Sequence, residues 1–251
     1  MCSLILFRFA TGFFLAGIYP VGMKIASDYF EEGLGRSLGF LVGALVLGTA
    51  FPHFLKGMSY GFSWQFVVFT TSVLAGVGGV LMVALVPNGP YHQPGASFKF
   101  SAFLSVFASR EFRSAAFGYF GHMWELYAFW AFVPLMLQTY LNTHTILNLN
   151  IALISFFVLG IGALTCVLGG YLSEKIGVQK IALIALALSG LCCLISPVFF
   201  VSDSIELFIA FLLFWGMMVI ADSPMFSTLV AQYAPPKLKG TALTIVNCIG
   251  F

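Results

Sequence analysis

Two titratable side chains stand in the middle of one of the most hydrophobic stretches of the chain, GYFGHMWELYAFWAFVPLML (residues 118–137). Tyr119, His122 and Glu125 recur at i, i+3 and i+6, which places all three on one broad face of a helix. Burial raises the pKa of a carboxyl group, and a nearby cation lowers it again. A carboxyl group that moves between dry and paired surroundings can therefore take up and release a proton.

Two further charges interrupt hydrophobic runs, Arg8 in RFATG and Asp222 in IADSP. An arginine or aspartate at the centre of a membrane helix costs about 2.5–3.5 kcal/mol on insertion scales, so such residues usually face a wet interior or a partner. Each has a plainer alternative: Arg8 can reach a nearby interface, and Asp222 can compensate for the backbone break at Pro224. Glu125 can equally make a structural hydrogen bond to a neighbouring helix.

The composition identifies the solvent as lipid. Of the 251 residues, 60% are hydrophobic and 8% are charged, whereas a soluble domain is about 25% charged. The net charge of +2 is spread along the chain without a basic patch, so nucleic acid is not an expected partner. The five cysteines form no CxxC pair, so we expect neither a disulfide framework nor a metal site. No GxSxG or HExxH motif is present, so we expect no catalytic residue, no cofactor and no enzyme.

The hydrophobic runs predict an all-α, polytopic membrane bundle, because they have the length of spanning helices and lack the alternation of barrel strands. The eight expected helical segments are 3–27, 37–56, 64–86, 114–140, 149–172, 180–200, 205–233, and 240 to the end. The last is only half as long as a span requires.

Lysines and arginines assign the two sides of this bundle. Nine of the eleven fall at or near the loops 28–36, 87–100, 173–180 and 235–240, while Lys56 alone marks the opposite loops. The positive-inside rule places the first side in the cytoplasm.

An internal echo indicates a duplicated unit. Residues 19–38 resemble 223–243, with Pro20 and Pro224 each nine residues before a tyrosine, an offset of 204 residues. Six spans with their loops occupy about that length, as in transporters with parallel repeats. We therefore expect two pseudo-symmetric six-helix halves, present in part: residues 1–86, a cytoplasmic linker at 87–113, and residues 114–251. The linker's 98–113 portion predicts an interfacial helix or an extension of the next span.

The loop GGYLSEKIGVQK (169–180) resembles a signature of the major facilitator superfamily, Gly-x-x-x-Asp-Arg/Lys-x-Gly-x-Arg/Lys. The matching residues are Gly170, Glu174, Lys175, Gly177 and Lys180. The loop departs from the signature in Glu174, which replaces aspartate, and in Gln179 beside Lys180. The resemblance implies a charge cluster that latches one conformation closed; the alternative is an ordinary basic loop.

Two other stretches extend the resemblance. RFATGFFLAGIYP (8–20) is similar to the family's fourth-helix element, and GFLVGALVLGTAFPHF (39–54) occupies the place of its fifth-helix glycine motif. The Gly-Pro-x-x-Gly-Gly ending of that motif is absent, so we do not infer antiport. In this register the chain matches approximately helices four to eleven of twelve, which we interpret as a fragment.

The resemblance also suggests a function. The family's first, fourth, seventh and tenth helices line a central cavity, and Arg8, Glu125 and Asp222 fall on the matching fourth, seventh and tenth. This implies a secondary transporter, a proton-coupled symporter that moves a small solute by alternating access. His122 and Tyr119 are further candidates for proton or substrate binding. The expected partners are the bilayer, a small solute and protons, and the expected location is the bacterial inner membrane. A uniporter without ion coupling, an intramembrane enzyme and a transport-dead receptor remain alternatives.

Overall fold

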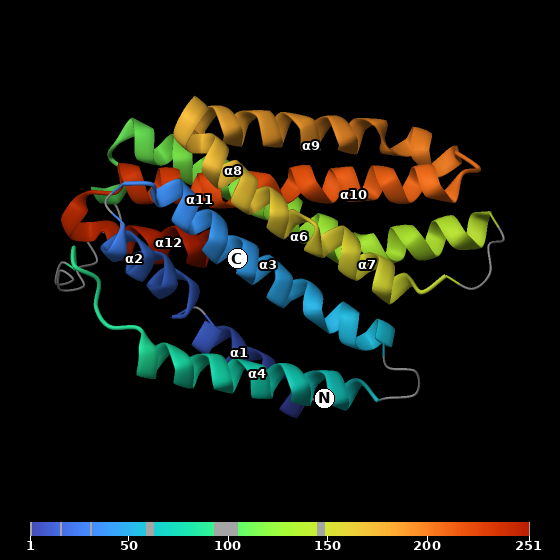
Figure 1. Ribbon diagram of the computed structural model, residues 1–251, viewed down its shortest axis with the longest axis horizontal. Helices are drawn as coiled ribbons and strands as arrows, with labels where there is room; N and C mark the ends of the chain where they lie inside the picture. Colours follow the sequence, from blue (N-terminus) through green and yellow to red (C-terminus); the bar gives the residue numbers. More distant parts are fainter. Residues whose placement is uncertain are drawn as a thin grey trace.

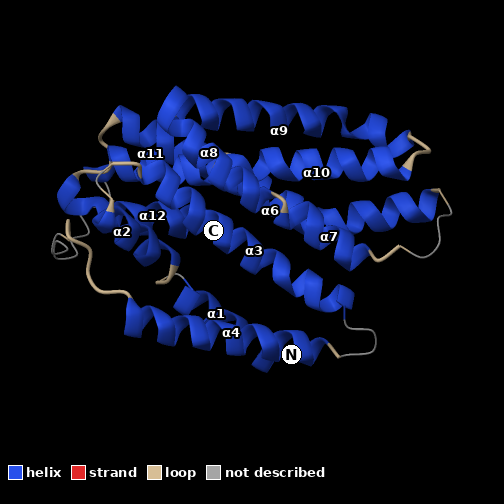
Figure 2. Ribbon diagram, in the orientation of Figure 1, coloured by secondary structure: helices blue, strands red, loops and turns tan. Residues whose placement is uncertain are grey.

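The computed structural model describes residues 2–15, 17–30, 32–58, 63–92, 105–144 and 149–250. Within these ranges all regular structure is helical, as the sequence predicts (Figure 2). The helices are α1 (Cys2–Leu15), α2 (Tyr19–Tyr29), α3 (Leu34–Met58), α4 (Trp64–Leu85), α6 (Arg110–Thr143), α7 (Ile151–Gly160), α8 (Gly162–Ile176), α9 (Val178–Val201), α10 (Ile205–Ala221), α11 (Ser223–Tyr233), η1 (Pro236–Leu238) and α12 (Lys239–Gly250).

Six stretches of the described chain are long and apolar enough to cross a membrane. They are Ile5–Tyr29, Leu34–Met58, Trp64–Leu85, Ile151–Ile176, Val178–Val201 and Ile205–Tyr233. The 34-residue helix α6 has the length of a span and is less apolar than these. These seven elements coincide with the first seven expected segments, and α12 lies where the shorter eighth was expected.

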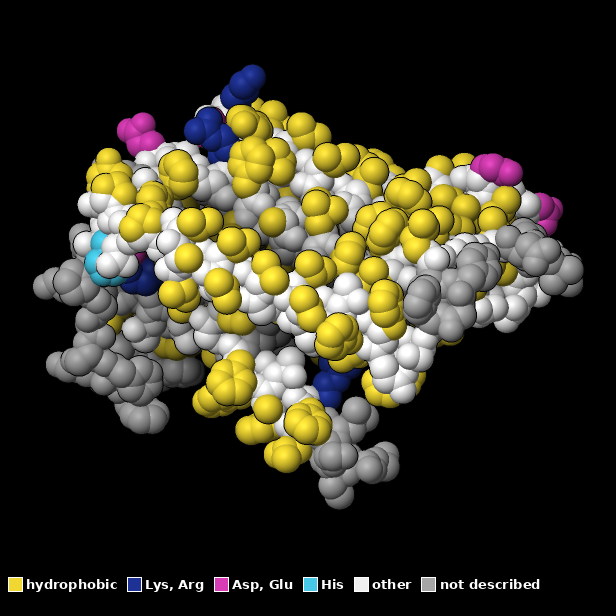
Figure 3. Space-filling model, turned by 60° about the horizontal axis from the view of Figure 1, so that its bottom comes forward, with side chains coloured by type: hydrophobic (Ala, Val, Ile, Leu, Met, Phe, Trp, Pro, Cys, Tyr) yellow, Lys and Arg dark blue, Asp and Glu magenta, His cyan; other side chains and the backbone are white. Residues whose placement is uncertain are grey.

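The connections between these helices alternate between two ends of an elongated bundle (Figure 1). At one end α2 leads into α3, α8 into α9, and α11 into α12; at the other lie the ends of α3, α6 and α9. Charged side chains gather mainly near these two ends, while hydrophobic side chains cover the length between them (Figure 3). This alternation matches the sidedness expected from the basic residues.

Three of the spans are broken in the middle, and a proline in the first turn after the break marks two of these breaks. At Asp222 the break follows from Pro224, which lies in the first turn of α11 and cannot donate a backbone hydrogen bond. Pro20 has the same position in α2, after the break at Gly17 and Ile18. The third break is at Ile161, between Gly160 and Gly162.

Helix α3 is the centre of the packing and contacts α7, α8 and α11 along its length. Glycines on α3 allow the close approach to α8: a Cβ atom at Gly39 would lie 2.6 Å from the Cys166 carbonyl oxygen. The expected halves 1–86 and 114–251 therefore touch along α3, and their boundary stays a prediction. Residues 93–104, with the part 98–104 of the expected interfacial helix (98–113), lie outside the described residues; Arg110 and Arg113 belong to the first turn of α6.

The outer surface is hydrophobic to a degree that water would not tolerate. Helix α4 has no buried residue among its 22 apolar-rich positions. Val83, Trp124 and Leu194 are 89%, 83% and 80% exposed. Large contiguous exposed apolar surfaces are rare on soluble monomers, so these side chains face the acyl chains of the bilayer.

Candidate functional site

His122 and Asp222 form a buried pair at the centre of the bundle. His122 is on α6 and Asp222 occupies the break between α10 and α11, so the break itself brings the carboxylate to α6. His122 Nδ1 lies 2.9 Å from Asp222 Oδ1, and the two side chains are 0% and 1% exposed. The pair carries opposite charges when the imidazole is protonated, and a buried charge is tolerated only with such a partner.

The hydrogen-bonding capacity of this pair is unused. The angles between the two groups do not meet those of a hydrogen bond, and no described residue hydrogen-bonds either ring nitrogen of His122 or either oxygen of Asp222. Asp222 also makes no side-chain cap for α11, so its carboxylate does not repair the break at Pro224. Unpaired buried polar atoms are costly, and such atoms commonly mark a site where water, a proton or a ligand binds.

Glu125 lies one helical turn from His122 and turns toward a different helix. Its Oε1 accepts a hydrogen bond from Ser189 Oγ on α9, and Ser189 Oγ in turn accepts one from Trp215 Nε1 on α10 at 3.2 Å. Glu125 is half-buried, and both His122 and Asp222 act on it electrostatically. The carboxylate therefore belongs to an interhelical hydrogen-bond chain adjacent to the buried pair.

Tyr119 and Arg8 have contrasting surroundings. Tyr119 is 1% exposed, and its hydroxyl donates a hydrogen bond of 2.5 Å to Asn247 Oδ1 on α12. Arg8 is exposed on α1, and it makes no ion pair with the described residues. The structure thus brings four of the five predicted charge or substrate residues close to α6 and leaves Arg8 apart.

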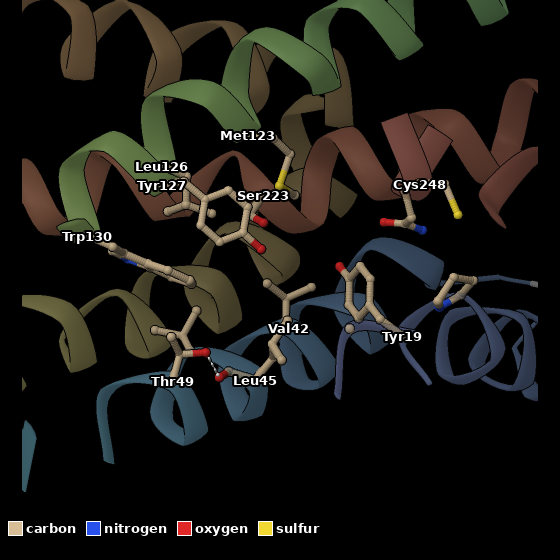
Figure 4. Close-up of a pocket in the computed structure, with 14 residues that line it drawn as sticks. Tyr19, Val42, Leu45, Thr49, Met123, Leu126, Tyr127, Trp130, Ser223 and Cys248 are labelled. Atoms are coloured by element: carbon tan, nitrogen blue, oxygen red, sulfur yellow. Dashed lines mark hydrogen bonds between the residues drawn. The ribbon is translucent and has the colours of Figure 1, made fainter. Parts of the chain in front are cut away.

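A cavity of about 530 Å³ lies beside this cluster, between α1, α2 and α3 on one side and α6, α11 and α12 on the other. Its walls include Tyr19, Val46, Thr49, Tyr127, Trp130 and Ser223. Figure 4 shows Tyr19, Thr49, Tyr127, Trp130 and Ser223 around one space. Met123 and Ser223, the chain neighbours of His122 and Asp222, line it, whereas the charged side chains themselves do not. Asn247, the partner of Tyr119, lines it as well.

A second space of about 620 Å³ lies on the other side of the pair, toward the first turn of α6. Its walls include Glu111, Gly118 and Phe226. The Phe226 ring stacks on the His122 ring, with 5.7 Å between centroids. Met123 and Ser223 thus line the first space in place of their neighbours His122 and Asp222, and the Phe226 ring that stacks on His122 lines the second.

The expected latch loop contacts the start of α3. Glu174 Oε1 lies 3.6 Å from Arg36 Nε, and the Arg36 guanidinium stacks over the Tyr171 ring, 5.5 Å from its centroid. A Cβ atom at Gly170 would lie 2.9 Å from the Arg36 Cα, so the close approach requires glycine. Gly177 ends α8 with a φ of 96°, a conformation that favours glycine. Lys175 and Lys180 are exposed and form no ion pair with the described residues.

A family model described as Major Facilitator Superfamily matches residues 2–251. The chain belongs to the Major Facilitator Superfamily. It is an integral, multi-pass membrane protein that lies in the lipid bilayer. Its family transports small molecules. Comparisons with curated proteins and with solved structures found no match.

The structure adds four residues that the sequence pattern did not single out. Ser189, Trp215 and Asn247 belong to the hydrogen bonds around Glu125 and Tyr119. Arg36 is the partner of Glu174. A buried serine or asparagine within a span carries a weak signal, because small polar residues are common in membrane helices. The roles of Ser189 and Asn247 become visible only from their bonding partners on neighbouring helices. Within the described part of the chain, no group of three or more His, Cys, Asp and Glu side chains is placed to hold a metal ion.

Proposed function

We propose that the chain is part of a secondary active transporter that moves a small solute by alternating access and couples this movement to protons. The observation that carries the proposal is the His122–Asp222 pair, buried and without hydrogen-bond partners among the described residues, beside a cavity between two groups of helices. Intramembrane acids and histidines of this kind are typical of proton relays in transporters.

The proton chemistry follows from the charge of the pair. With one proton on the imidazole and none on the carboxylate, the pair is neutral overall. Loss of that proton leaves a net negative charge in a dry interior, and gain of a second leaves a net positive one; both are costly. The pair therefore exchanges its proton when a rearrangement lets water reach it. Glu125, one turn away on α6, is the second group that we expect to take part.

In the proposed alternating access, the contact between α3 and the α8–α9 turn forms when this end of the bundle closes and breaks when it opens. Arg36, Glu174 and the packed glycines hold this end of the bundle together. Separation there would open the 530 Å³ cavity to the same side of the membrane. We assign that side to the cytoplasm from the excess of lysine and arginine, and the membrane to the bacterial inner membrane.

A flux assay with liposomes tests the coupling. The complete protein is reconstituted with a trapped pH dye, and a panel of small organic solutes is added outside. We expect at least one solute to drive proton entry, and Asp222→Asn to abolish proton entry while solute exchange continues. Glu125→Gln is expected to weaken the coupling in the same way.

The control is Glu206→Gln, an exposed acid at the opposite end of the bundle, which should leave the proton signal unchanged. If Asp222→Asn and Glu125→Gln both retain solute-driven proton entry, the pair is not the coupling site. Solute exchange that never moves protons in the unmodified protein would identify a uniporter instead.

A further inference from the structure

The walls of the central cavity differ in chemistry from the charged cluster beside it. Hydrophobic and aromatic side chains dominate the lining, and the polar groups are the hydroxyls of Tyr19, Thr49, Tyr127 and Ser223, the Asn247 amide and the Trp130 indole. Among the described residues that form the walls, none carries a charge. In Figure 4 the hydroxyls of Tyr19, Tyr127 and Ser223 point toward the space that the walls enclose.

The described walls offer no counter-charge to a ligand. An ion held against these walls would lose its hydration without gaining a counter-charge from them, which is strongly unfavourable. The nearby charges do not serve, because His122 and Asp222 are buried against each other and Glu125 is bonded to Ser189 on α9. A sugar-like molecule with many hydroxyls would also leave some of its hydrogen bonds unmade, because hydrophobic side chains make up most of the walls.

Tyr127 and Trp130 indicate two further properties of the ligand, an aromatic ring and a hydrogen-bond acceptor. The rings of Tyr127 and Trp130 lie edge to face, with centroids 5.6 Å apart, and offer further aromatic contacts to a flat molecule. Trp130 Nε1 is buried and has no hydrogen-bond partner among the described residues. A buried indole N–H normally has an acceptor, so a ligand oxygen near Trp130 would satisfy it.

We propose that the central cavity binds an uncharged, aromatic small molecule that carries an oxygen acceptor. The volume of about 530 Å³ lies within the range of pockets that hold drug-sized ligands. The inference rests on the proposed function, since it gives the class of solute that would be moved, but it concerns equilibrium binding and does not require coupling.

Equilibrium binding of matched probes to the complete protein tests the chemical class. The probes are tritiated 1-naphthol, the carboxylate anion 1-naphthoate on the same ring system, naphthalene without an acceptor, and sucrose as a neutral polar solute. We expect 1-naphthol to bind at least about tenfold more tightly than 1-naphthoate at pH 7, and sucrose not to bind. Equal or tighter binding of 1-naphthoate or sucrose would overturn the proposal.

Paired variants separate binding in the cavity from partition into lipid. Val46 is 2% exposed and lines the cavity, whereas its neighbour Leu47 is 49% exposed on the outer face. Val46→Phe should place a ring in the cavity and weaken saturable 1-naphthol binding by at least about tenfold, and Leu47→Phe should leave binding unchanged. Unchanged 1-naphthol affinity in Val46→Phe contradicts the assignment of this cavity.

The indole donor is tested without filling the cavity, which keeps the proposal testable if Val46→Phe fails to fold. Trp130→Phe should weaken 1-naphthol binding by about three- to tenfold, the effect of one hydrogen bond, and leave naphthalene binding unchanged. Trp124→Phe on the lipid-facing side of α6 is the control and should change neither. Equal losses for both probes in Trp130→Phe would argue against an oxygen acceptor at this position.

Binding and transport fail independently in these experiments. If 1-naphthol binds as expected but no solute drives protons, the cavity assignment stands and coupled transport is rejected. If an anionic solute is transported and Val46→Phe blocks it, transport stands and the uncharged class is wrong.

Discussion

The free-energy cost of burying His122 or Asp222 is offset only when the other residue lies beside it. Each would be a costly isolated group in the dry interior, and the 2.9 Å approach offsets that cost only while both are present. No described residue hydrogen-bonds the atoms of the pair, so these atoms retain the capacity to bind water or a further proton.

Removing both partners together should therefore cost less than the sum of removing each alone. We expect Asp222→Asn to lower the free energy of unfolding by about 3 kcal/mol, because it leaves a buried imidazole without its charge partner. The double variant His122→Gln/Asp222→Asn should be less destabilised than the sum of the single variants. Titration with dodecyl sulfate in mixed micelles measures these values. Additive losses would mean that the two groups are not coupled.

The hydrogen-bond chain of Glu125 makes a separate prediction at Ser189. Ser189→Ala removes both the donor to Glu125 and the acceptor of Trp215 Nε1, so we expect a loss of about 1–2 kcal/mol in unfolding free energy. Ser196→Ala on the same helix is the control, because that hydroxyl bonds only the nearby Cys193 carbonyl and is exposed. If Ser189→Ala lowers the free energy of unfolding no more than Ser196→Ala does, the hydrogen bonds of Glu125, Ser189 and Trp215 contribute nothing to stability.

At the scale of elements, α3 and α8 approach closely because small residues face each other. Gly39 meets the Cys166 carbonyl and Gly43 meets the Ala163 carbonyl, where a Cβ atom would lie 2.6 Å and 3.0 Å away. In lipid, where burial of apolar area between helices gains little, such close packing is a principal source of helix association. The same glycines bring the start of α3 within reach of Glu174.

A methyl group added at this interface should push α3 and α8 apart. We expect Gly39→Ala to destabilise the protein by about 1–3 kcal/mol, because the opposing group is backbone and cannot move aside. Gly48→Ala on the same helix has no atom within 4 Å of the added Cβ atom. It should be neutral, or stabilising by up to about 1 kcal/mol, because glycine weakens a helix interior. Thermal unfolding in detergent compares the two, and similar behaviour would contradict tight packing at Gly39.

The sequence predicts the positions of the helices well and their interruptions poorly. Hydrophobic length fixes spans such as Leu34–Met58 and Val178–Val201 to within a few residues. The break at Asp222 is signalled by Pro224, whereas no proline marks the one at Ile161, where Gly162 packs closely against Ile220 in a tertiary contact. The partners of Glu125 and Glu174 were not predictable for the same reason, since each lies on another helix.

For the whole molecule, the important contact is the one that joins α3 to the C-terminal group of helices at the end assigned to the cytoplasm. The ion pair between Arg36 and Glu174 is about 40% exposed on both sides, with side-chain values of 43% and 38%. Exposed ion pairs contribute about 0–1 kcal/mol, so the glycine packing supplies most of the closure and the charges adjust it. A weak closure of this kind is compatible with the alternating access that we propose.

Glu174→Gln should therefore loosen this end of the bundle by a small and salt-dependent amount. We expect hydrogen exchange of the amides in residues 34–40 and 170–176 to rise about two- to fivefold at low ionic strength, the effect of up to 1 kcal/mol. The increase should shrink in high salt, because the unmodified pair is then screened as well. Lys175→Gln, one residue away and without an ion pair in the described part of the chain, should leave exchange unchanged. A larger effect from Lys175 than from Glu174 would mean that the basic character of the loop, and not the bond to Arg36, holds the two groups of helices together.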